Sequence, residues 1–78
     1  MNEHRLGNRL RQLRSDKDLT QADLAKLAGV SRKTINTVEN GVFVPSVQLA
    51  LVLSQVLGTS VEELFYLVSD GSRRDGQR

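Results

Sequence analysis

Residues 32–40 combine side chains that can read DNA bases with side chains suited to burial. On a helix, at about 100° per residue, Ile35 and Val38 point to one side and polar residues point to the other. Arg and Lys can donate to guanine edges, Asn can pair with adenine, and a Thr methyl can contact a thymine methyl. The pattern therefore predicts a helix whose outer face fits the major groove. Its outer set is Lys33, Thr37 and Asn40, flanked by Asn36 and by Arg32 at the N-terminal end.

A polar outer face is more often simply solvated, so the preceding residues decide the interpretation. Thr20 and Asp23 have the spacing of a capping box that begins a helix, and Gly29 supplies the positive φ of a tight helix exit. Ser31 can cap the helix that follows. Two helices separated by only Gly29, Val30 and Ser31 match a helix-turn-helix in turn length and composition.

Three further helices are expected around this pair. Apolar spacing predicts the first from Leu6 to about Lys17, Ser46 can cap another over residues 47–57, and Ser60 opens a short fifth. The run 65–68 either ends the fifth helix or forms a short C-terminal strand. The expected fold is all-α, a compact five-helix domain over residues 6–68, between a flexible N-terminus (1–5) and a disordered polar tail (69–78).

Charge is unevenly distributed along the chain. Residues 1–41 contain eight Lys/Arg and five Asp/Glu, whereas residues 42–70 contain three acidic residues and no Lys or Arg. A basic N-terminal half suggests a side that faces a polyanion and an opposite side with another role. On charge alone, ordinary surface scatter is the alternative.

The sequence offers no side-chain set for catalysis, a metal or a cofactor. It has no cysteine, and its single histidine is His4, in the expected flexible N-terminus. Glu62 and Glu63 are adjacent on a predicted helix and do not face each other. We therefore expect no enzymatic activity, no metal and no cofactor. The longest apolar stretch, residues 47–57, is well short of the ~20 residues that a membrane span needs, so a cytoplasmic protein is expected.

Four short motifs stand in register along the chain. They are Leu19-Thr20-Gln21 at the start of the second helix, Gly29-Val30-Ser31 at the turn, Glu39-Asn40-Gly41 at the exit of the third helix, and Pro45-Ser46 at the entry of the fourth. Together they resemble the Cro/C1-type (XRE) helix-turn-helix domain of phage repressors and bacterial regulators, over about residues 6–65. The resemblance implies a five-helix, lambda-repressor-like fold with the third helix in the major groove.

The resemblance also implies which residues read bases. Arg32, Lys33 and Thr37 match positions that usually reach bases, with Asn36 a more variable contributor. Residues 42–44, Val-Phe-Val, depart from the family pattern, because many relatives have Lys or other polar residues there. That departure removes a common source of phosphate contacts.

Other positions match residues that contact the DNA backbone. Gln21 matches a glutamine that contacts a phosphate and braces the recognition helix, and the unpaired amides of a helix start favour an anion there. Ser31 and Thr34 match positions near base edges or backbone. Asn40 matches part of a phosphate clamp.

Arg14 and Glu39 are expected to form a structural ion pair. Arg14 lies one turn after Leu10, at the margin of the buried face of the first helix, and Glu39 lies at the margin of the buried face of the third. Opposite charges at two core margins should meet, and the family commonly has such a pair. The alternative is that each side chain is separately solvated.

The helix over residues 47–57 is apolar nearly all round, which predicts burial nearly all round. This helix carries a second apolar stripe, and one small domain has little other surface with which to cover it. We therefore expect a symmetric homodimer, with two recognition helices on an inverted repeat. The alternative is that residues 65–68 fold back and cover the stripe within one chain. The expected dimer interface consists of Leu49, Val52, Val56, Phe65, Tyr66 and Leu67.

Taken together, these patterns predict a sequence-specific transcriptional regulator of double-stranded DNA, a repressor that occupies an inverted-repeat operator. Phosphate contacts would supply affinity and base contacts would supply specificity. The alternative is an antitoxin or a protein-interaction adaptor that uses the same fold. An adaptor has no need to keep Arg32 and Lys33 exposed.

Overall fold

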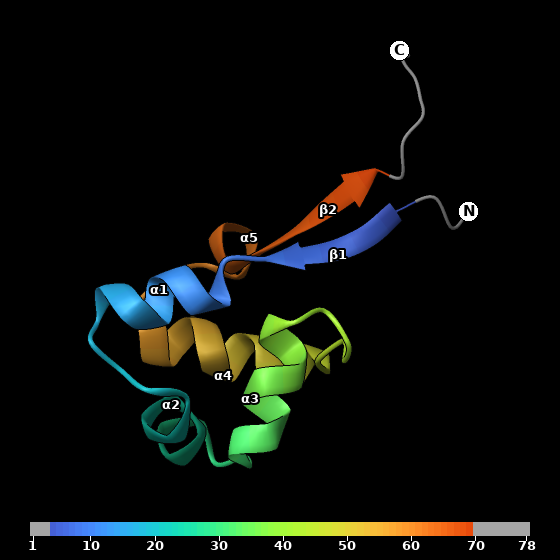
Figure 1. Cartoon of the computed structure of the whole chain (residues 1–78). Coiled ribbons are helices and arrows are strands. Elements are labelled where there is room, and N and C mark those ends of the chain that lie inside the picture. The colour runs from blue at the N-terminus through green and yellow to red at the C-terminus, as the bar shows by residue number, and fades with distance from the viewer. Residues whose placement is uncertain (1–3, 70–78) are drawn as a thin grey trace.

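The computed structural model describes residues 4–69, so residues 1–3 and the expected polar tail beyond Ser69 lie outside the described residues. Within this range five helices form the body, and two strands extend from it together (Figure 1). The elements are β1 (His4–Asn8), α1 (Leu10–Asp16), α2 (Gln21–Ala28), α3 (Arg32–Glu39), α4 (Val47–Leu57), α5 (Val61–Leu64) and β2 (Phe65–Ser69).

Side-chain caps set the starts of four of the helices, as the sequence predicted. Each cap residue has an extended backbone, and its hydroxyl accepts a hydrogen bond from the amide three residues later, which satisfies one unpaired donor of the first turn. Gly29 ends α2 in the left-handed conformation, with φ of 74°, which turns the chain directly into α3. The caps are Thr20, Ser31, Ser46 and Ser60.

The sheet corrects the all-α prediction in part. β2 is the short C-terminal strand that was expected as an alternative for residues 65–68, whereas β1 was not predicted. β1 and β2 pair antiparallel, with Leu6 opposite Leu67 and Gly7 opposite Tyr66. The first helix therefore begins at Leu10 rather than at Leu6. Asn8 makes this break, because its Oδ1 accepts from the Leu10 amide at 3.0 Å while its Nδ2 donates to the Val38 carbonyl at 3.0 Å.

Leu6 and Leu10 have the spacing of one helix face because both side chains contact the same core. Leu10 is buried and Leu6 packs against the same core, but one lies in a helix and the other in a strand. His4 and Arg5 also belong to β1, so the prediction of a flexible N-terminus over residues 1–5 is wrong for these two residues. Their order comes from pairing with β2, which local sequence could not reveal.

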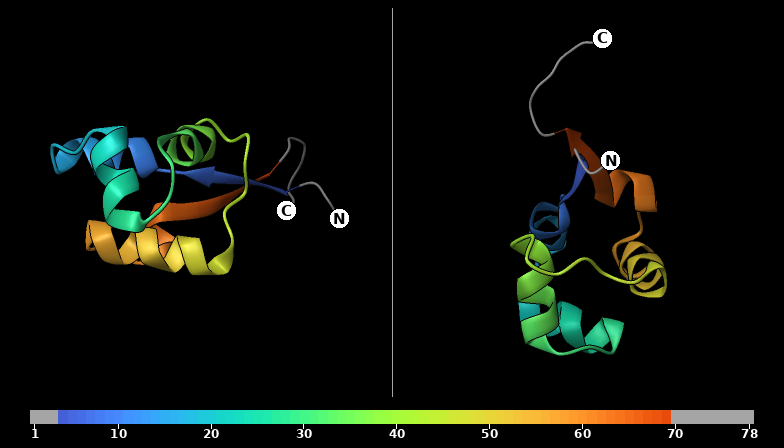
Figure 2. Two further views of the ribbon diagram at one scale, coloured as in Figure 1. Left: turned by 90° about the horizontal axis from the view of Figure 1, so that it is seen from below. Right: turned by 90° about the vertical axis from the view of Figure 1, so that its right-hand side faces the viewer.

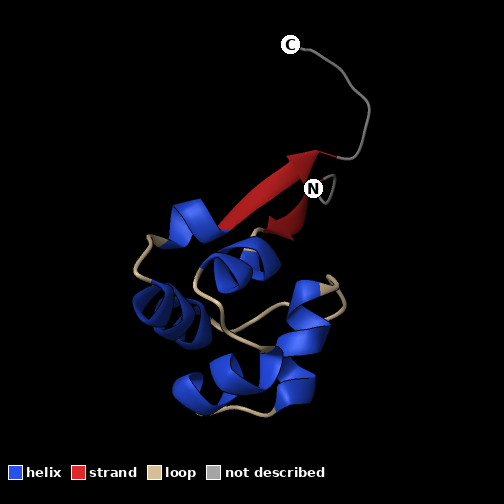
Figure 3. Ribbon diagram, turned by 60° about the vertical axis from the view of Figure 1, so that its left-hand side comes forward, coloured by secondary structure: helices blue, strands red, loops and turns tan. Residues whose placement is uncertain are grey.

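The core lies between the helices and the base of the sheet. α2 and α3 pack against each other, and α4 covers the side of α2. Both strands leave the helical body on the same side (Figures 2 and 3). The buried apolar residues are Leu10, Leu24, Ala25, Ile35, Val38, Leu53, Leu57, Leu64 and Phe65.

Candidate nucleic-acid interface

The turn between α2 and α3 holds α3 with one side buried and the other side exposed. Ile35 and Val38 are buried and form the back of α3. Ser31 fixes its start, because the Ser31 hydroxyl accepts from the Thr34 amide at 3.1 Å. A helix anchored at its back and at its start presents its outer side chains in a defined orientation.

The predicted base-reading residues lie together on that outer face. Arg32, Lys33 and Asn36 are exposed, and Thr37 is half-buried. The Thr37 hydroxyl donates to the Thr34 carbonyl at 3.0 Å, so its polar atom is partly engaged by its own helix. The face therefore offers two cationic donors and one amide that extend from a fixed helix.

Asn40 differs in its environment from the other predicted contacts. It is the C-terminal cap of α3, and its Nδ2 donates to Asn36 Oδ1 at 3.2 Å. Its Oδ1 accepts from Arg11 Nη2 at 3.1 Å. Asn40 therefore links the outer face of α3 to a side chain of α1.

Glu39 is the centre of a buried polar network behind this face. Its side chain has no exposed surface, and Arg14 Nε lies 2.6 Å from Glu39 Oε2. Glu39 Oε1 also accepts from Arg14 Nη2 at 3.2 Å and from Gln21 Nε2 at 3.1 Å. The expected Arg14–Glu39 pair is thus present in the structure, and Gln21 joins the same carboxylate.

These contacts lower the pKa of Glu39. Burial, the largest single influence, would raise this pKa, but it is outweighed by the hydrogen bonds from Arg14 and Gln21, the charge of Arg14 and the hydrogen bond from Arg11. The pKa of Arg14 is raised, mainly by its hydrogen bond to Glu39. Both side chains therefore remain charged at neutral pH, and the network fixes α1 and α2 against the end of α3.

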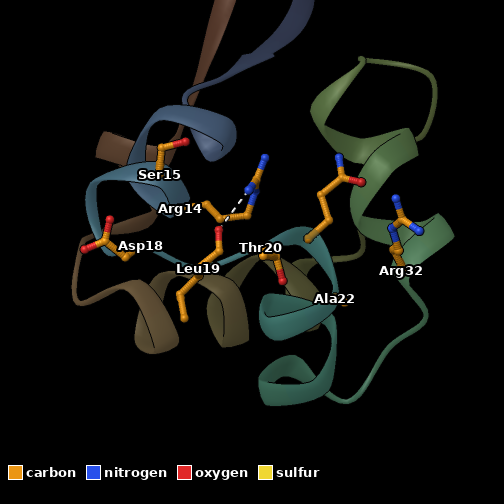
Figure 4. Close-up of a pocket in the computed structure, with 8 residues that line it drawn as sticks. Arg14, Ser15, Asp18, Leu19, Thr20, Ala22 and Arg32 are labelled. Atoms are coloured by element: carbon orange, nitrogen blue, oxygen red, sulfur yellow. Dashed lines mark hydrogen bonds between the residues drawn. The ribbon is translucent and has the colours of Figure 1, made fainter.

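A surface hollow of about 600 Å³ lies beside the start of α2 and includes Gln21. Figure 4 places Arg14 on one side of this hollow and Arg32 on the other, with Thr20 between them. Arg14 Nη1 is engaged by the Leu19 carbonyl at 2.8 Å. The exposed Arg32 guanidinium near the N-terminal end of α2 makes this a suitable place for a phosphate, whereas the Arg14 guanidinium is already held by Glu39 and the Leu19 carbonyl.

Sequence reasoning missed Arg11. Its Nε lies 3.3 Å from Glu39 Oε1, and its side chain is 63% exposed. It stands three residues before Arg14, which places the two on one face of α1. That spacing was the available signal, but it did not indicate that both arginines would reach the end of α3.

The residues of the expected dimer interface differ in how far they are buried within one chain. Phe65 is only 7% exposed and belongs to the core, so its assignment to the interface is wrong. Leu49 and Val56 are half-buried and pack against the core of their own chain. The core of one chain thus covers part of the stripe on α4, whereas Tyr66 and Leu67 of β2 remain exposed.

Other kinds of site find little support in residues 4–69. The described residues contain no group of three or more His, Asp or Glu that could hold a metal ion. None of the described helices has the length and hydrophobicity to cross a bilayer. His4 lies exposed on β1.

Comparison with known proteins agrees with this geometry. A family model described as a helix-turn-helix domain matches residues 5–66. The uncharacterised HTH-type transcriptional regulator MJ0272 of Methanocaldococcus jannaschii is 41% identical over 63 residues, which cover 81% of this chain and 96% of that protein.

Two solved structures combine sequence identity with the same fold. The restriction–modification controller protein C.AhdI of Aeromonas hydrophila is 38% identical, with a TM-score of 0.68 over 70% of this chain and 83% of that chain. SinR, the master regulator for biofilm formation, solved in complex with DNA, is 33% identical, with a TM-score of 0.64 over 68% of this chain and 86% of that chain. The chain therefore belongs to the Cro/C1-type helix-turn-helix family of DNA-binding transcriptional regulators.

Proposed function

We propose that this regulator is a repressor, which binds an inverted-repeat operator and acts by occupying it. The observation that supports this best is the outer face of α3, where Arg32, Lys33 and Asn36 are exposed on a helix whose back is buried. Two turns of helix fit the width of the major groove. Bound across a promoter, such a protein excludes RNA polymerase without any catalytic step.

The residues divide into base-reading and backbone-binding groups in this proposal. Arg32 and Lys33 donate to guanine edges, Asn36 pairs with adenine, and Thr37 offers its methyl group to thymine. Backbone contacts position the domain without reading sequence. Gln21, Ser31, Thr34 and Asn40 are assigned to these backbone contacts, with Ser31 and Thr34 close enough to the groove to contact base edges as well.

The proposed assembly is a homodimer, and β2 is a better interface than α4. The Arg9 amide donates to the Leu64 carbonyl at 2.9 Å, and the alternation of an antiparallel ladder then directs the Leu67 amide and carbonyl away from β1. Leu67 is also 69% exposed. An edge with an exposed apolar residue and unpaired backbone groups invites another strand.

The two edges of the sheet differ in charge, which favours one mode of pairing. β1 carries His4 and Arg5, whereas the residues of β2 are all uncharged. Charged residues discourage pairing at an edge, so β2 is the less protected edge. Antiparallel pairing with β2 of a second copy, centred on Leu67, obeys two-fold symmetry. For the dimer to bind an inverted repeat, this pairing must bring the two copies of α3 to half-sites about one DNA turn, ~34 Å, apart.

The compartment and the chemistry follow from this role. A regulator that binds DNA acts where the DNA is, so we assign the chain to the cytoplasm and give it no enzymatic activity. Use of the fold as a protein-interaction adaptor is less well supported, because an adaptor has no need of Arg32 and Lys33 on an exposed helix face. An antitoxin with the same fold stays the alternative.

Selection of bound duplexes from a random DNA pool tests the proposal. We expect an inverted repeat to be enriched, and binding upstream of a reporter gene to reduce transcription. Enrichment of a single half-site would contradict the dimer, and failure to enrich any sequence would contradict sequence-specific binding. Increased reporter transcription on binding would contradict repression.

A further inference from the structure

We propose that Arg11 is a phosphate anchor at the C-terminal end of α3, separate from the Gln21 site at the start of α2. The inference rests on the proposed function, in which α3 enters the major groove. A helix in that groove has a sugar-phosphate backbone on each side of it, so both ends of the helix can be anchored.

A chain of hydrogen bonds connects Arg11 to the outer face of α3. Arg11 Nη2 lies 3.1 Å from Asn40 Oδ1, and Asn40 Nδ2 lies 3.2 Å from Asn36 Oδ1. Asn36 is exposed on the face that is proposed to meet the bases. The Arg11 guanidinium is therefore a direct continuation of that face, although it comes from α1.

The charges around Glu39 leave one positive charge in excess. A single carboxylate faces two guanidinium groups, and Arg14 holds it more closely, at 2.6 Å against 3.3 Å for Arg11. The Arg14 side chain is 14% exposed, whereas that of Arg11 is 63% exposed. The uncompensated charge is thus presented to solvent by Arg11, where a phosphate could serve as the second anion.

The segment that follows α3 offers no cation of its own beside Arg11. The segment 41–46 that follows α3 has no Lys or Arg, and its Val42 and Val44 are exposed. A hollow of about 480 Å³ lies beside Arg11 and is lined in part by Arg9, which stacks on the Tyr66 ring at 4.6 Å. Arg11 therefore supplies the cation that the segment after α3 does not.

Arg11 could instead serve only as a brace for Glu39, and salt-dependent binding distinguishes the two roles. We would measure the binding of wild type, Arg11→Gln and Arg11→Lys to an operator duplex and to a random duplex across a salt series. Lys17→Gln is the matched control, because it removes one positive charge beside Gly58, at the far end of α4.

For an anchor, Arg11→Gln weakens binding to both duplexes by the same factor, roughly threefold to tenfold, and lowers the slope of log K against log salt by about 0.9. Arg11→Lys recovers the slope, because it keeps the charge. Lys17→Gln leaves both affinity and slope at the wild-type values.

Other outcomes overturn the inference or its premise separately. An unchanged salt slope for Arg11→Gln, with or without a lower melting temperature, leaves Arg11 as a brace. A loss confined to the operator duplex makes Arg11 a base contact. Absence of binding by wild type to either duplex defeats the proposed function itself.

Discussion

The Nε atom of Arg14 lies 2.6 Å from Oε2 of Glu39, whose side chain has no exposed surface. The same arginine donates from Nη1 to the Leu19 carbonyl at 2.8 Å. One side chain of α1 thus holds both the segment that leads into α2 and the last residue of α3. This contact therefore fixes the end of α3 against α1 and the segment before α2.

Glu39→Gln is expected to lower the free energy of unfolding by about 3–5 kcal/mol, because it leaves the Arg14 guanidinium in a largely buried site without its counter-charge. Urea unfolding followed by circular dichroism measures the change. Glu62→Gln, at an exposed position of α5, is the control and should change stability by less than about 0.5 kcal/mol. A loss below about 1 kcal/mol for Glu39→Gln would mean that the pair acts like an exposed one.

Stability should also fall in acid, and Glu39 should account for part of the loss. Its pKa is lowered in the folded state, so on acidification the unfolded chain takes up a proton first. The stabilisation is therefore fully present above the unfolded pKa, about 4.3, and is lost as pH falls through the folded pKa. Thermal melts from pH 7 to pH 3 measure this dependence.

The comparison of wild type with Glu39→Gln isolates the contribution of this one carboxylate. Some acid sensitivity should persist in the variant, because two capping carboxylates also have lowered pKa values. For Asp23 the main cause is the Thr20 amide, and for Glu63 it is the Thr59 hydroxyl. Parallel pH profiles for the variant and wild type would contradict the assignment to Glu39.

The sequence predicts most of the helical body because its signals are local. Cap residues such as Ser31 and Ser46 bond to amides only three residues away, and that spacing can be read without a fold. The Arg14–Glu39 contact joins two helices, yet it is predictable because each residue stands at the edge of an apolar face.

The sheet and the role of Arg11 could not be predicted in the same way. β1 pairs with a strand about sixty residues later, and five-residue strands offer too little alternation to compete with the helical spacing of Leu6 and Leu10. Arg11 and Asn40 are both surface residues by pattern. Only the approach of α1 to the end of α3 brings their side chains together.

Gly7→Val should destabilise the domain even though valine favours strands. A Cβ at Gly7 would stand 2.7 Å from Tyr66 Cζ and 2.9 Å from Val68 Cγ2, so the Tyr66 ring must leave its position under Arg9. Overpacking of this kind costs about 1–3 kcal/mol. Arg5→Val, on the same face of β1, is the control, and Tyr66→Ala should relieve most of the loss. Equal losses for Gly7→Val with and without Tyr66 would exclude the ring as the cause.

Arg32→Ala and Lys33→Ala should each weaken binding to the operator by about 1–3 kcal/mol, while binding to random DNA changes less. Both side chains are exposed on α3 and are proposed to donate to guanine. Gln21→Ala should instead weaken binding to all sequences alike, because a phosphate contact carries no sequence information. Fluorescence anisotropy with both duplexes measures the difference. Equal losses on the two duplexes for Arg32→Ala would reassign Arg32 to the DNA backbone.

The last prediction concerns the dimer, whose interface we place on β2. Leu67→Lys puts a charge at the centre of the proposed strand pair, so it should separate the copies while each remains folded. Leu51→Lys, at an exposed position of α4, should leave the dimer intact, and Val52→Glu tests the interface on α4 that the apolar pattern suggested. Sedimentation equilibrium at tens of micromolar measures the assembly of each variant, and circular dichroism checks the fold.

Dissociation by Val52→Glu but not by Leu67→Lys would move the interface to α4, and a monomeric wild type would reject the dimer. With β2 as the interface, Leu67→Lys should bind a full inverted repeat no more tightly than a half-site, because each domain then binds DNA alone.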